Sequence, residues 1–342
     1  MSDQAITARR PTMRMVADAA GVSAATVSYV LSGRTSAGEG KSGISDTTTR
    51  RILQAAETLN YSPNQAARSI RTGKTNLVLL SLTMLSDPWA QAVSTAASAE
   101  VAKDGRTAMI LADGDWAVVL QKQTPDVAFI DAADATHAAQ LKTLASSGMN
   151  LVVMSDTLEP DGFDVVRSPA VPGCRKAMEH LLETHTDIAC LATSSAKSHP
   201  VPSRYSVYLD AMAEAGLDVP EGRVGFAELH PAAAYDAALR LLSGPTPPSA
   251  IYAVTDFAAL SAINAAHQLH LRIPEDIAII GAGNTPDGEL AHPALSTVGP
   301  ADAYGEIACL LRSRAAEKER SADRVITLEW ELFVRGSSHT TT

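Results

Sequence analysis

The N-terminal stretch from Thr12 to Leu31 constrains the fold of this chain more than any other part of it. Residues 13–20 predict a short helix, Gly21-Val22 a tight turn, and Ser23 the N-cap of a second helix, because a serine hydroxyl accepts hydrogen bonds from the free amides of the next turn. Two short helices joined in this way form a helix-turn-helix. The second helix has an apolar face and an opposite, outward face that is free to meet DNA; the apolar face carries Val27, Val30 and Leu31, and the outward face carries Ala24, Ala25, Ser28 and Tyr29.

A third helix is expected after a polar loop, with Ser45 as its N-cap. It should span Asp46 to Leu59 and bury one apolar side, which is enough for a small all-α domain of three helices. The side chains expected to face inward are Ile52, Leu53, Ala56 and Leu59. The loop from Arg34 to Gly43 either contacts a DNA backbone through Arg34 or Lys41 or has no role.

This order of residues resembles the lactose-repressor/galactose-repressor family of bacterial transcription regulators. The resemblance is carried by MVADAAGVSAATVSYVLSG, followed by ISDTTTRRILQAAETLNYSPNQAARSIRTGKT. It implies a helix-turn-helix DNA-binding domain at 12–61 and a hinge helix with a linker at 62–75. In the family, the second helix lies in the major groove, and the hinge helix inserts an apolar side chain into the minor groove.

The resemblance assigns DNA-contacting roles by position. Phosphates are expected to bind Ser23, Thr26 and Ser28, and base edges to meet Ala24, Ala25 and Tyr29. The hinge supplies Ile70 as the minor-groove wedge, with Ala67 beside it. Further backbone contacts are implied for Asn60, Tyr61 and Asn64, and the basic charge of the hinge adds Arg68.

Two departures from the family pattern affect the expected contacts. Tyr29 stands where members usually carry Arg, the side chain that pairs bidentately with guanine, so the DNA sequence that is read should differ at that step. The wedge is Ile70 rather than Leu, a change that stiffens the side chain and keeps its volume. Bending of the DNA is therefore expected to survive.

Charge is divided unevenly along the 342 residues, whose net charge is −10. The first 76 residues hold ten Lys/Arg against five Asp/Glu, a net +5, so the other 266 carry −15. A basic segment attached to an acidic body steers toward a polyanion, with an affinity that falls as salt rises. The charge pattern therefore agrees with the helix-turn-helix.

From Asn76 onward, short aliphatic runs alternate with alanine-rich helical stretches, which is typical of parallel α/β sheets. Strands are expected at 77–82, 107–111, 127–130, 151–154, 188–191, 223–226, 250–254, 277–280 and 325–328. Helices are expected at 89–103, 135–146, 173–183, 204–215, 232–242, 257–269 and 303–317. Two lobes are implied, with a break near Met154 to Asp161 and a return near Gly281 to Val298.

The family resemblance continues through LSDPWAQAV, RYSVYLDAMAEAGL, AIYAVTDFAALSAINAAHQLHLRIPEDIAIIGAGN, HPALSTV as a crossover and LFVRGSS as the closing strand. It implies that 76–336 form a two-lobed, periplasmic-binding-protein-like effector-binding and dimerisation domain with parallel sheets. By position, the cleft should be lined by Trp89, Arg204, Asp256 and Asn284. The alternatives are core or lobe-edge packing for Trp89 and a salt-bridged surface for Arg204 and Asp256.

Three departures affect this cleft. Ala90 stands where relatives carry a second aromatic side chain, and Gly283, followed by Asn284, stands where they carry an Asp that holds ligand hydroxyls. The segment between Leu111 and Val127 is expected to be too short for the helix that relatives have there. The grip on a sugar is therefore expected to be reduced, and the pocket either binds another effector or is vestigial.

Patterns that would indicate an enzyme or a metal site are weak. Gly281-Ala282-Gly283 lacks the third glycine of a dinucleotide loop, and Pro286 is expected to block a helix start, which predicts a loop. Glu179, His180 and His185 have poor spacing for a shared metal. The scattered cysteines, Cys174, Cys190 and Cys309, are expected to be reduced thiols. No enzymatic activity and no cofactor are predicted.

The sequence therefore predicts a DNA-binding transcription regulator, most consistent with a repressor, that acts as a homodimer on a pseudo-palindromic operator of double-stranded DNA. A small-molecule effector of unknown identity is an expected partner. No apolar run or leader predicts a membrane association, so a cytoplasmic location is expected. The alternatives are a two-lobed small-molecule-binding protein without a role on DNA and an enzyme built on the same α/β body.

Overall fold

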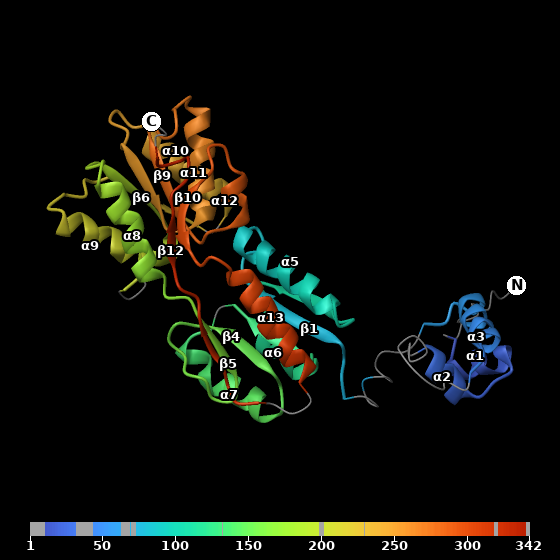
Figure 1. Ribbon diagram of the computed structural model, residues 1–342. Coiled ribbons are helices and arrows are strands. Elements are labelled where there is room, and N and C mark those ends of the chain that lie inside the picture. The colour runs from blue at the N-terminus through green and yellow to red at the C-terminus, as the bar shows by residue number, and fades with distance from the viewer. Residues whose placement is uncertain are drawn as a thin grey trace, which may run out of the picture. The chain divides into compact units, whose positions relative to one another are not determined.

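The computed structural model describes residues 11–31, 44–62, 69, 73–131, 133–197, 202–228, 230–317 and 321–339. Contacts divide the chain into two compact units, residues 1–75 and 76–342 (Figure 1). We call them the head and the body and describe each by itself.

The described part of the head contains α1 (Met13–Ala20), α2 (Ala24–Leu31) and α3 (Asp46–Thr58). Each helix starts with a hydroxyl that accepts a hydrogen bond from a main-chain amide, at Thr12, Ser23 and Ser45. Gly21 ends α1 in the left-handed conformation, with φ of 60°, which glycine adopts without steric cost. The core contains Val16, Val27, Val30, Ile52 and Ala56. The predicted helices and caps of the head are thus confirmed.

One predicted core position of the head is wrong. Leu53 is 50% exposed, whereas Ile52 beside it is fully buried. Ile52 and Ala56 are four residues apart and form the inward stripe of α3, so Leu53, about 100° further round the helix, points away.

The first lobe of the body is built on a parallel sheet with the strand order β11-β5-β4-β3-β1-β2. Helices α5 (Pro88–Ala102) and α13 (Ala303–Ala316) pack on one face, and α6 (Trp116–Lys122) and α7 (Ala138–Ser146) pack on the other. A 3₁₀ turn, η1 (Ala135–His137), leads into α7. The strands are β1 (Leu77–Leu82), β2 (Thr107–Ala112), β3 (Val127–Ile130), β4 (Leu151–Met154), β5 (Asp164–Arg167) and β11 (Val325–Thr327).

The second lobe has the strand order β12-β10-β9-β8-β6-β7, parallel except for β12, which runs antiparallel to β10. One core contains side chains of α8 (Ala170–Leu182) and α9 (Arg204–Glu214), and the other those of α10 (Pro231–Leu242) and α11 (Asp256–Gln268). The strands are β6 (Ile188–Thr193), β7 (Val224–Ala227), β8 (Ala250–Ala253), β9 (Ala278–Ala282), β10 (Ser296–Gly299) and β12 (Glu331–Phe333). Two short elements, η2 (Ser194–Lys197) and α12 (Pro286–Leu290), complete this lobe.

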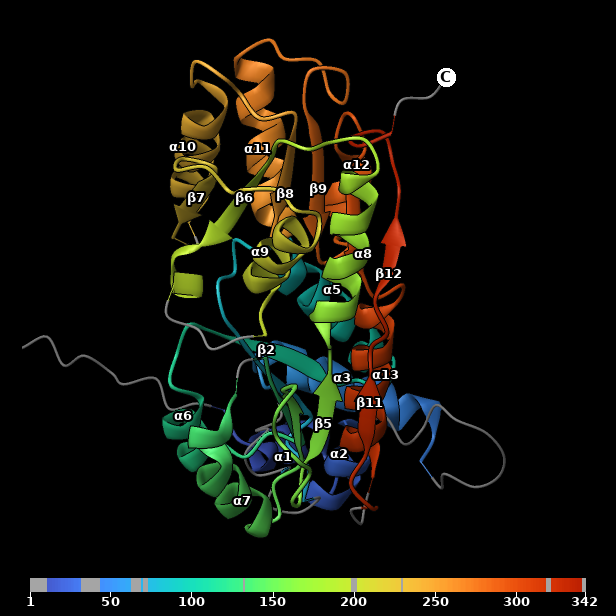
Figure 2. The ribbon, with the colours of Figure 1, turned by 90° about the vertical axis from the view of Figure 1, so that its left-hand side faces the viewer.

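Within its described residues, the chain passes between the lobes at three places: after β5, after β10 and between β11 and β12. Figure 2 shows the last of these, where β11 and β12 follow one another from one lobe into the other. The predicted break at 154–161 is wrong, because β5 still belongs to the first sheet. The predicted return at 281–298 is also wrong, because Ser296–Gly299 form a strand of the second sheet before the chain leaves that lobe.

Two further local expectations are wrong because favourable helix starts were overlooked. The segment between Leu111 and Val127 does contain a helix, α6, whose first amides donate to the Asp115 carboxylate. Pro286 does not block a helix but begins α12, because the first helical residue needs no amide hydrogen bond. Gly281 and Ala282 lie in β9 rather than in a loop.

Candidate functional site

The outward face of α2 presents the residues that were assigned to DNA. Ala24 and Ala25 are exposed, and Thr26, Ser28 and Tyr29 are partly exposed, while Val27 and Val30 are buried. Ser23 is exposed as well, and its hydroxyl lies 2.8 Å from that of Thr26. The capped helix therefore carries small and hydroxyl-bearing side chains on the surface of the head.

The remaining residues assigned to DNA lie at or beyond the end of α3. Asn60 is exposed and has a positive φ of 49°, and Tyr61 packs partly against the head core. Asn64, Ala67, Arg68 and Ile70 lie outside the described residues, as does the loop that carries Arg34 and Lys41.

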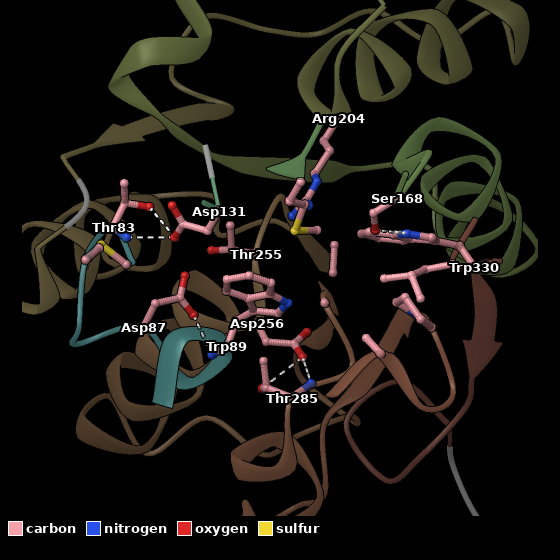
Figure 3. A pocket seen from close by; sticks show the side chains of 17 residues that line it. Thr83, Asp87, Trp89, Asp131, Ser168, Arg204, Thr255, Asp256, Thr285 and Trp330 are labelled. Carbon is pink, nitrogen blue, oxygen red and sulfur yellow. Dashed lines mark hydrogen bonds between the residues drawn. The ribbon is translucent and has the colours of Figure 1, made fainter. Parts of the chain in front are cut away.

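A cavity of about 230 Å³ lies between the two lobes of the body (Figure 3). It is formed where the carboxyl ends of parallel strands from both sheets meet, which is the usual ligand position in open α/β folds. The lining residues are Thr83, Met84, Asp87, Trp89, Asp131, Met154, Ser168, Arg204, Thr255, Asp256, Ala282, Gly283, Thr285, Pro300, Ala303, Leu328 and Trp330. The cavity thus brings together Trp89, Arg204 and Asp256 of the predicted set.

Arg204 is the first residue of α9 and reaches into the cavity from the second lobe (Figure 3). One of its terminal nitrogens, Nη1, donates to the Val254 carbonyl at 3.0 Å. Its guanidinium carbon lies 4.9 Å from the centre of the Trp330 ring, a cation–π contact. Among the described residues no carboxylate oxygen lies within 4 Å of its guanidinium, so hydrogen-bond donors remain for an occupant of the cavity.

Asp256 lines the cavity and also joins neighbouring segments of the second lobe through hydrogen bonds. Its carboxylate is almost fully buried and accepts from the Thr285 amide at 2.6 Å and from the hydroxyls of Thr285 and Thr297. Burial raises the pKa of Asp256, and the hydrogen bonds from Thr285 and Thr297 act in the opposite direction. A side chain at Gly281 would collide with this carboxylate, so the glycine in β9 makes room for it.

Asn284 of the predicted set does not line the cavity, and its side chain is fixed by two hydrogen bonds. Its amide nitrogen donates to the Pro300 carbonyl at 2.9 Å, and its side-chain oxygen accepts from Arg335 at 2.9 Å. The neighbouring Gly283 lines the cavity instead. The side chain of Asn284 therefore braces the passage between the lobes.

Two aspartates in the lining were not identified from the sequence. Asp87 is the N-cap of α5 and accepts from the Trp89 amide at 2.9 Å. Asp131 follows β3 and accepts from the amide and hydroxyl of Thr83, at 2.7 and 3.0 Å. Both aspartates lie in the loops that follow parallel strands, and a polar side chain at such a position is the sequence signal that could have identified them.

Ser168 and Trp330 were also missed, and they lie at the crossings between the lobes. The Trp330 indole nitrogen donates to the Ser168 hydroxyl at 2.9 Å, in a buried contact. Figure 3 shows this pair on the side of the cavity opposite Thr83 and Asp131. No local motif marks either residue, because the two are 162 positions apart in the chain.

Residues considered for other chemistry have ordinary partners. The His180 ring lies 2.8 Å from the Ser338 hydroxyl, and the His185 ring 3.1 Å from that of Ser249. Cys174 and Cys190 are buried, and Cys309 is exposed. Within the described ranges, none of the helices combines the length and hydrophobicity that crossing a bilayer requires.

Two family models match the sequence. Residues 12–64 match the bacterial regulatory proteins of the lacI family, and residues 178–338 match the periplasmic binding protein-like domain. The chain is 27% identical to the ribose operon repressor of Escherichia coli over 308 residues, 87% of this chain and 90% of that one. It is 29% identical to the HTH-type transcriptional regulator DegA of Bacillus subtilis over 345 residues, 96% of this chain and 98% of that one.

Solved structures share the fold. A transcriptional regulator from Silicibacter pomeroyi, a lacI family protein, has a TM-score of 0.75 at 20% identity, covering 96% of this chain and 99% of its own. The lac repressor dimer bound to operator has a TM-score of 0.71 at 18% identity, covering 97% and 100%. The complex of the regulator CelR with cellobiose has a TM-score of 0.60 at 24% identity, covering 96% and 100%.

Proposed function

Because this chain belongs to the lacI family of bacterial regulatory proteins and is a DNA-binding transcriptional regulator, we propose that it represses transcription from a pseudo-palindromic operator. It binds this operator as a homodimer, and a small molecule in the cavity between the lobes alters its affinity for the DNA. The observation that carries the proposal is the capped helix α2 with its small and hydroxyl-bearing outward face.

Helix α2 acts as the recognition helix. An α-helix fits the major groove, and the short side chains of Ala24 and Ala25 allow a close approach to base edges and thymine methyl groups. Tyr29 cannot form the bidentate pair that arginine makes with guanine, so it reads a different feature at that step. Ser23, Thr26 and Ser28 supply hydroxyls for phosphate oxygens.

The domain organisation we propose is a DNA-binding domain at 12–61, a hinge and linker at 62–75 and an effector-binding and dimerisation domain at 76–336. In the hinge, Ile70 with Ala67 wedges into the minor groove, while Asn64 and Arg68 hold the DNA backbone, together with Asn60 and Tyr61. Two-fold symmetry in the protein requires two half-sites in the operator.

The cavity is the effector site because its lining comes from both lobes. A molecule that contacts both lobes binds better when they are closed, so its binding shifts the lobe equilibrium. One structural neighbour is a regulator in complex with cellobiose, so a regulator of this fold binds a small molecule. Trp89, Arg204 and Asp256 border the ligand, and no catalytic role is inferred for them. A function on chromosomal DNA requires a cytoplasmic location.

The first test selects bound sites from random duplex DNA with the full-length protein. We expect a two-fold symmetric consensus sequence. The Tyr29→Ala variant should bind this consensus about tenfold more weakly than the wild type, which is toward the low end of what one base contact contributes. Gln54→Ala is the matched control, because Gln54 is exposed on α3 of the same domain and is assigned no contact. Equal DNA affinities of the two variants would show that α2 does not contact the operator. A monomeric protein without a preference for any duplex would refute the whole proposal.

The second test measures operator affinity with and without the small-molecule fraction of a cell extract. Arg204→Ala should abolish the change in affinity that the extract causes. Arg175→Ala is the control, because Arg175 lies on α8 in an exposed ion pair with Glu214. If the extract changed the operator affinity of Arg204→Ala as much as that of the wild type, the effector role of the cavity would be refuted.

A further inference from the structure

We propose that the cavity between the lobes binds a ligand that carries a positively charged amine, with the free carboxylate oxygens of Asp87 and Asp131 as its acceptors. This inference rests on the proposed effector role of the cavity and adds the chemical class of the ligand. The cavity itself, which lies between both lobes and is lined by two indoles and a guanidinium, defines the site.

In each of the two carboxylates one oxygen accepts hydrogen bonds from another described residue, and the second oxygen accepts none from the other described residues. Asp87 accepts the Trp89 amide through Oδ1, and no other described residue donates to it. Asp131 accepts both groups of Thr83 through Oδ2, and no other described residue donates to its second oxygen. Since both side chains line the cavity, the second oxygens are acceptors that an occupant can reach.

The charge of the lining favours a cation over a neutral polyol. Among the described residues of the lining, three aspartates (Asp87, Asp131 and Asp256) oppose one arginine, Arg204. Asp256 already has three donors from the protein, whereas Asp87 and Asp131 lack a cation within ion-pair distance among the described residues. Hydroxyl groups would satisfy the free oxygens as hydrogen-bond donors but would leave the charge uncompensated.

The burial of these carboxylates supports the same conclusion. Burial raises the pKa of Asp87, although the Trp89 hydrogen bond and the charge of Arg204 act against it. Burial likewise raises the pKa of Asp131, with a smaller contribution in the same direction from the nearby Asp113. An ammonium group beside them would favour the ionised form, so its binding would be coupled to their charge.

Aromatic faces and the remaining donors define the rest of the ligand. Figure 3 shows the Trp89 indole extending into the cavity, where its face is available to a cation. The Trp330 ring is already covered by Arg204, whose unused N–H groups suit hydroxyl, carboxylate or phosphate oxygens. The ligand is therefore an amine at one end and oxygen-rich at the other, with the size of a monosaccharide or smaller.

The test is titration calorimetry of the full-length protein, without DNA, against matched pairs of compounds at neutral pH. The pairs are glucosamine and glucose, Tris and pentaerythritol, and putrescine and butane-1,4-diol. We expect the amine of at least one pair to bind about tenfold or more tightly than its neutral partner, as expected for a charge-assisted hydrogen bond in place of a neutral one. Equal or tighter binding of the neutral partners, or no binding of any amine at millimolar concentration, would overturn the proposal.

Substitutions then locate the preference. Asp87→Asn and Asp131→Asn keep one oxygen for Trp89 and Thr83, remove the charge and put an NH2 donor in place of the free acceptor oxygen, so each should lose the preference for the amine by about tenfold. Asp113→Asn is the control, because Asp113 accepts the Met84 amide at 2.7 Å from the neighbouring strand end and does not line the cavity. Retention of the preference in both cavity variants would refute the assignment.

These measurements are independent of the regulatory role. Operator affinity is measured separately with the same amines. Amine binding without any change in operator affinity would support the ligand class and refute the effector function. If only the neutral compounds changed operator affinity, the effector function would be supported and the ligand class would be refuted.

Discussion

Replacing Arg314 with methionine should destabilise the body strongly, because Arg314 forms a fully buried ion pair. Its guanidinium donates to both carboxylate oxygens of Asp164, at 2.5 and 2.6 Å, and neither side chain has any exposed surface. A methionine at this position would remove the Arg314 guanidinium from the buried Asp164 carboxylate, to which the Arg324 amide also donates at 2.9 Å. Breaking a buried pair from one side costs about 3–5 kcal/mol of unfolding free energy.

The measurement is chemical denaturation followed by tryptophan fluorescence. All three tryptophans, Trp89, Trp116 and Trp330, belong to the body, so the transition reports on that unit alone. Arg312→Met is the matched control on the same helix, because Arg312 pairs with Glu100 and Asp104 but is 38% exposed. Its loss should be small and should shrink further at high salt.

A double-mutant cycle decides whether the pair itself is responsible. Asp164→Ala leaves the Arg314 guanidinium with Glu317 as its remaining ion-pair partner, and Arg314→Met removes that guanidinium from Asp164, whereas the double variant removes both members of the pair. The double variant should therefore lose clearly less stability than the two single losses added together. Strict additivity, or equal losses in Arg314→Met and Arg312→Met, would refute this reasoning.

Further predictions concern the head, the cavity and the hinge. Ile52→Ala should cost about 2–5 kcal/mol and lower the hydrogen-exchange protection of α3, whereas Leu53→Ala, at a half-exposed position, should leave that protection nearly unchanged. Burial raises the pKa of Asp256, so as pH rises above 3.8 the wild type should lose stability relative to Asp256→Asn; a pH-independent difference between their melting temperatures would contradict this. Arg68→Ala should reduce the slope of log affinity against log salt by about one, and Ile70→Ala should reduce DNA bending in a circular-permutation gel assay. An unchanged slope or an unchanged bend would remove the respective residue from the proposed interface.

The head could be predicted almost completely from the sequence because its determinants are local. Ser23 and Ser45 cap helices within three residues of their partners, and the apolar spacing of α2 identifies its buried face. Leu53 was wrongly assigned to the core because it is apolar and directly follows the buried Ile52 in the sequence. Composition alone does not show that it lies outside the inward stripe of α3.

The lobe boundaries could not be predicted because they depend on which sheet a strand joins. β5 and β10 are short, contain polar residues and gain their place only by pairing with β4 and β9. A sequence pattern can indicate a strand but not its neighbour across a sheet.

The cavity was predicted in part for a related reason. Arg204 and Asp256 are the first residues of α9 and α11, and both helices lie in segments that resemble the family, so the resemblance was enough to place these two residues in the cleft. Asp87, Asp131 and Trp330 meet them only because three passages between the lobes bring distant segments to one place.

Those passages also set the order in which the lobes can be completed on the ribosome. The second sheet, apart from its edge strand β12, is contained in one uninterrupted segment, residues 188–299. The first lobe begins earlier in the chain but lacks α13 and β11 until that whole segment has been synthesised. Until α13 emerges, the nascent chain exposes the apolar side of α5 that α13 later covers, so the lobe of the body that is begun first is completed only after most of the second lobe has been translated.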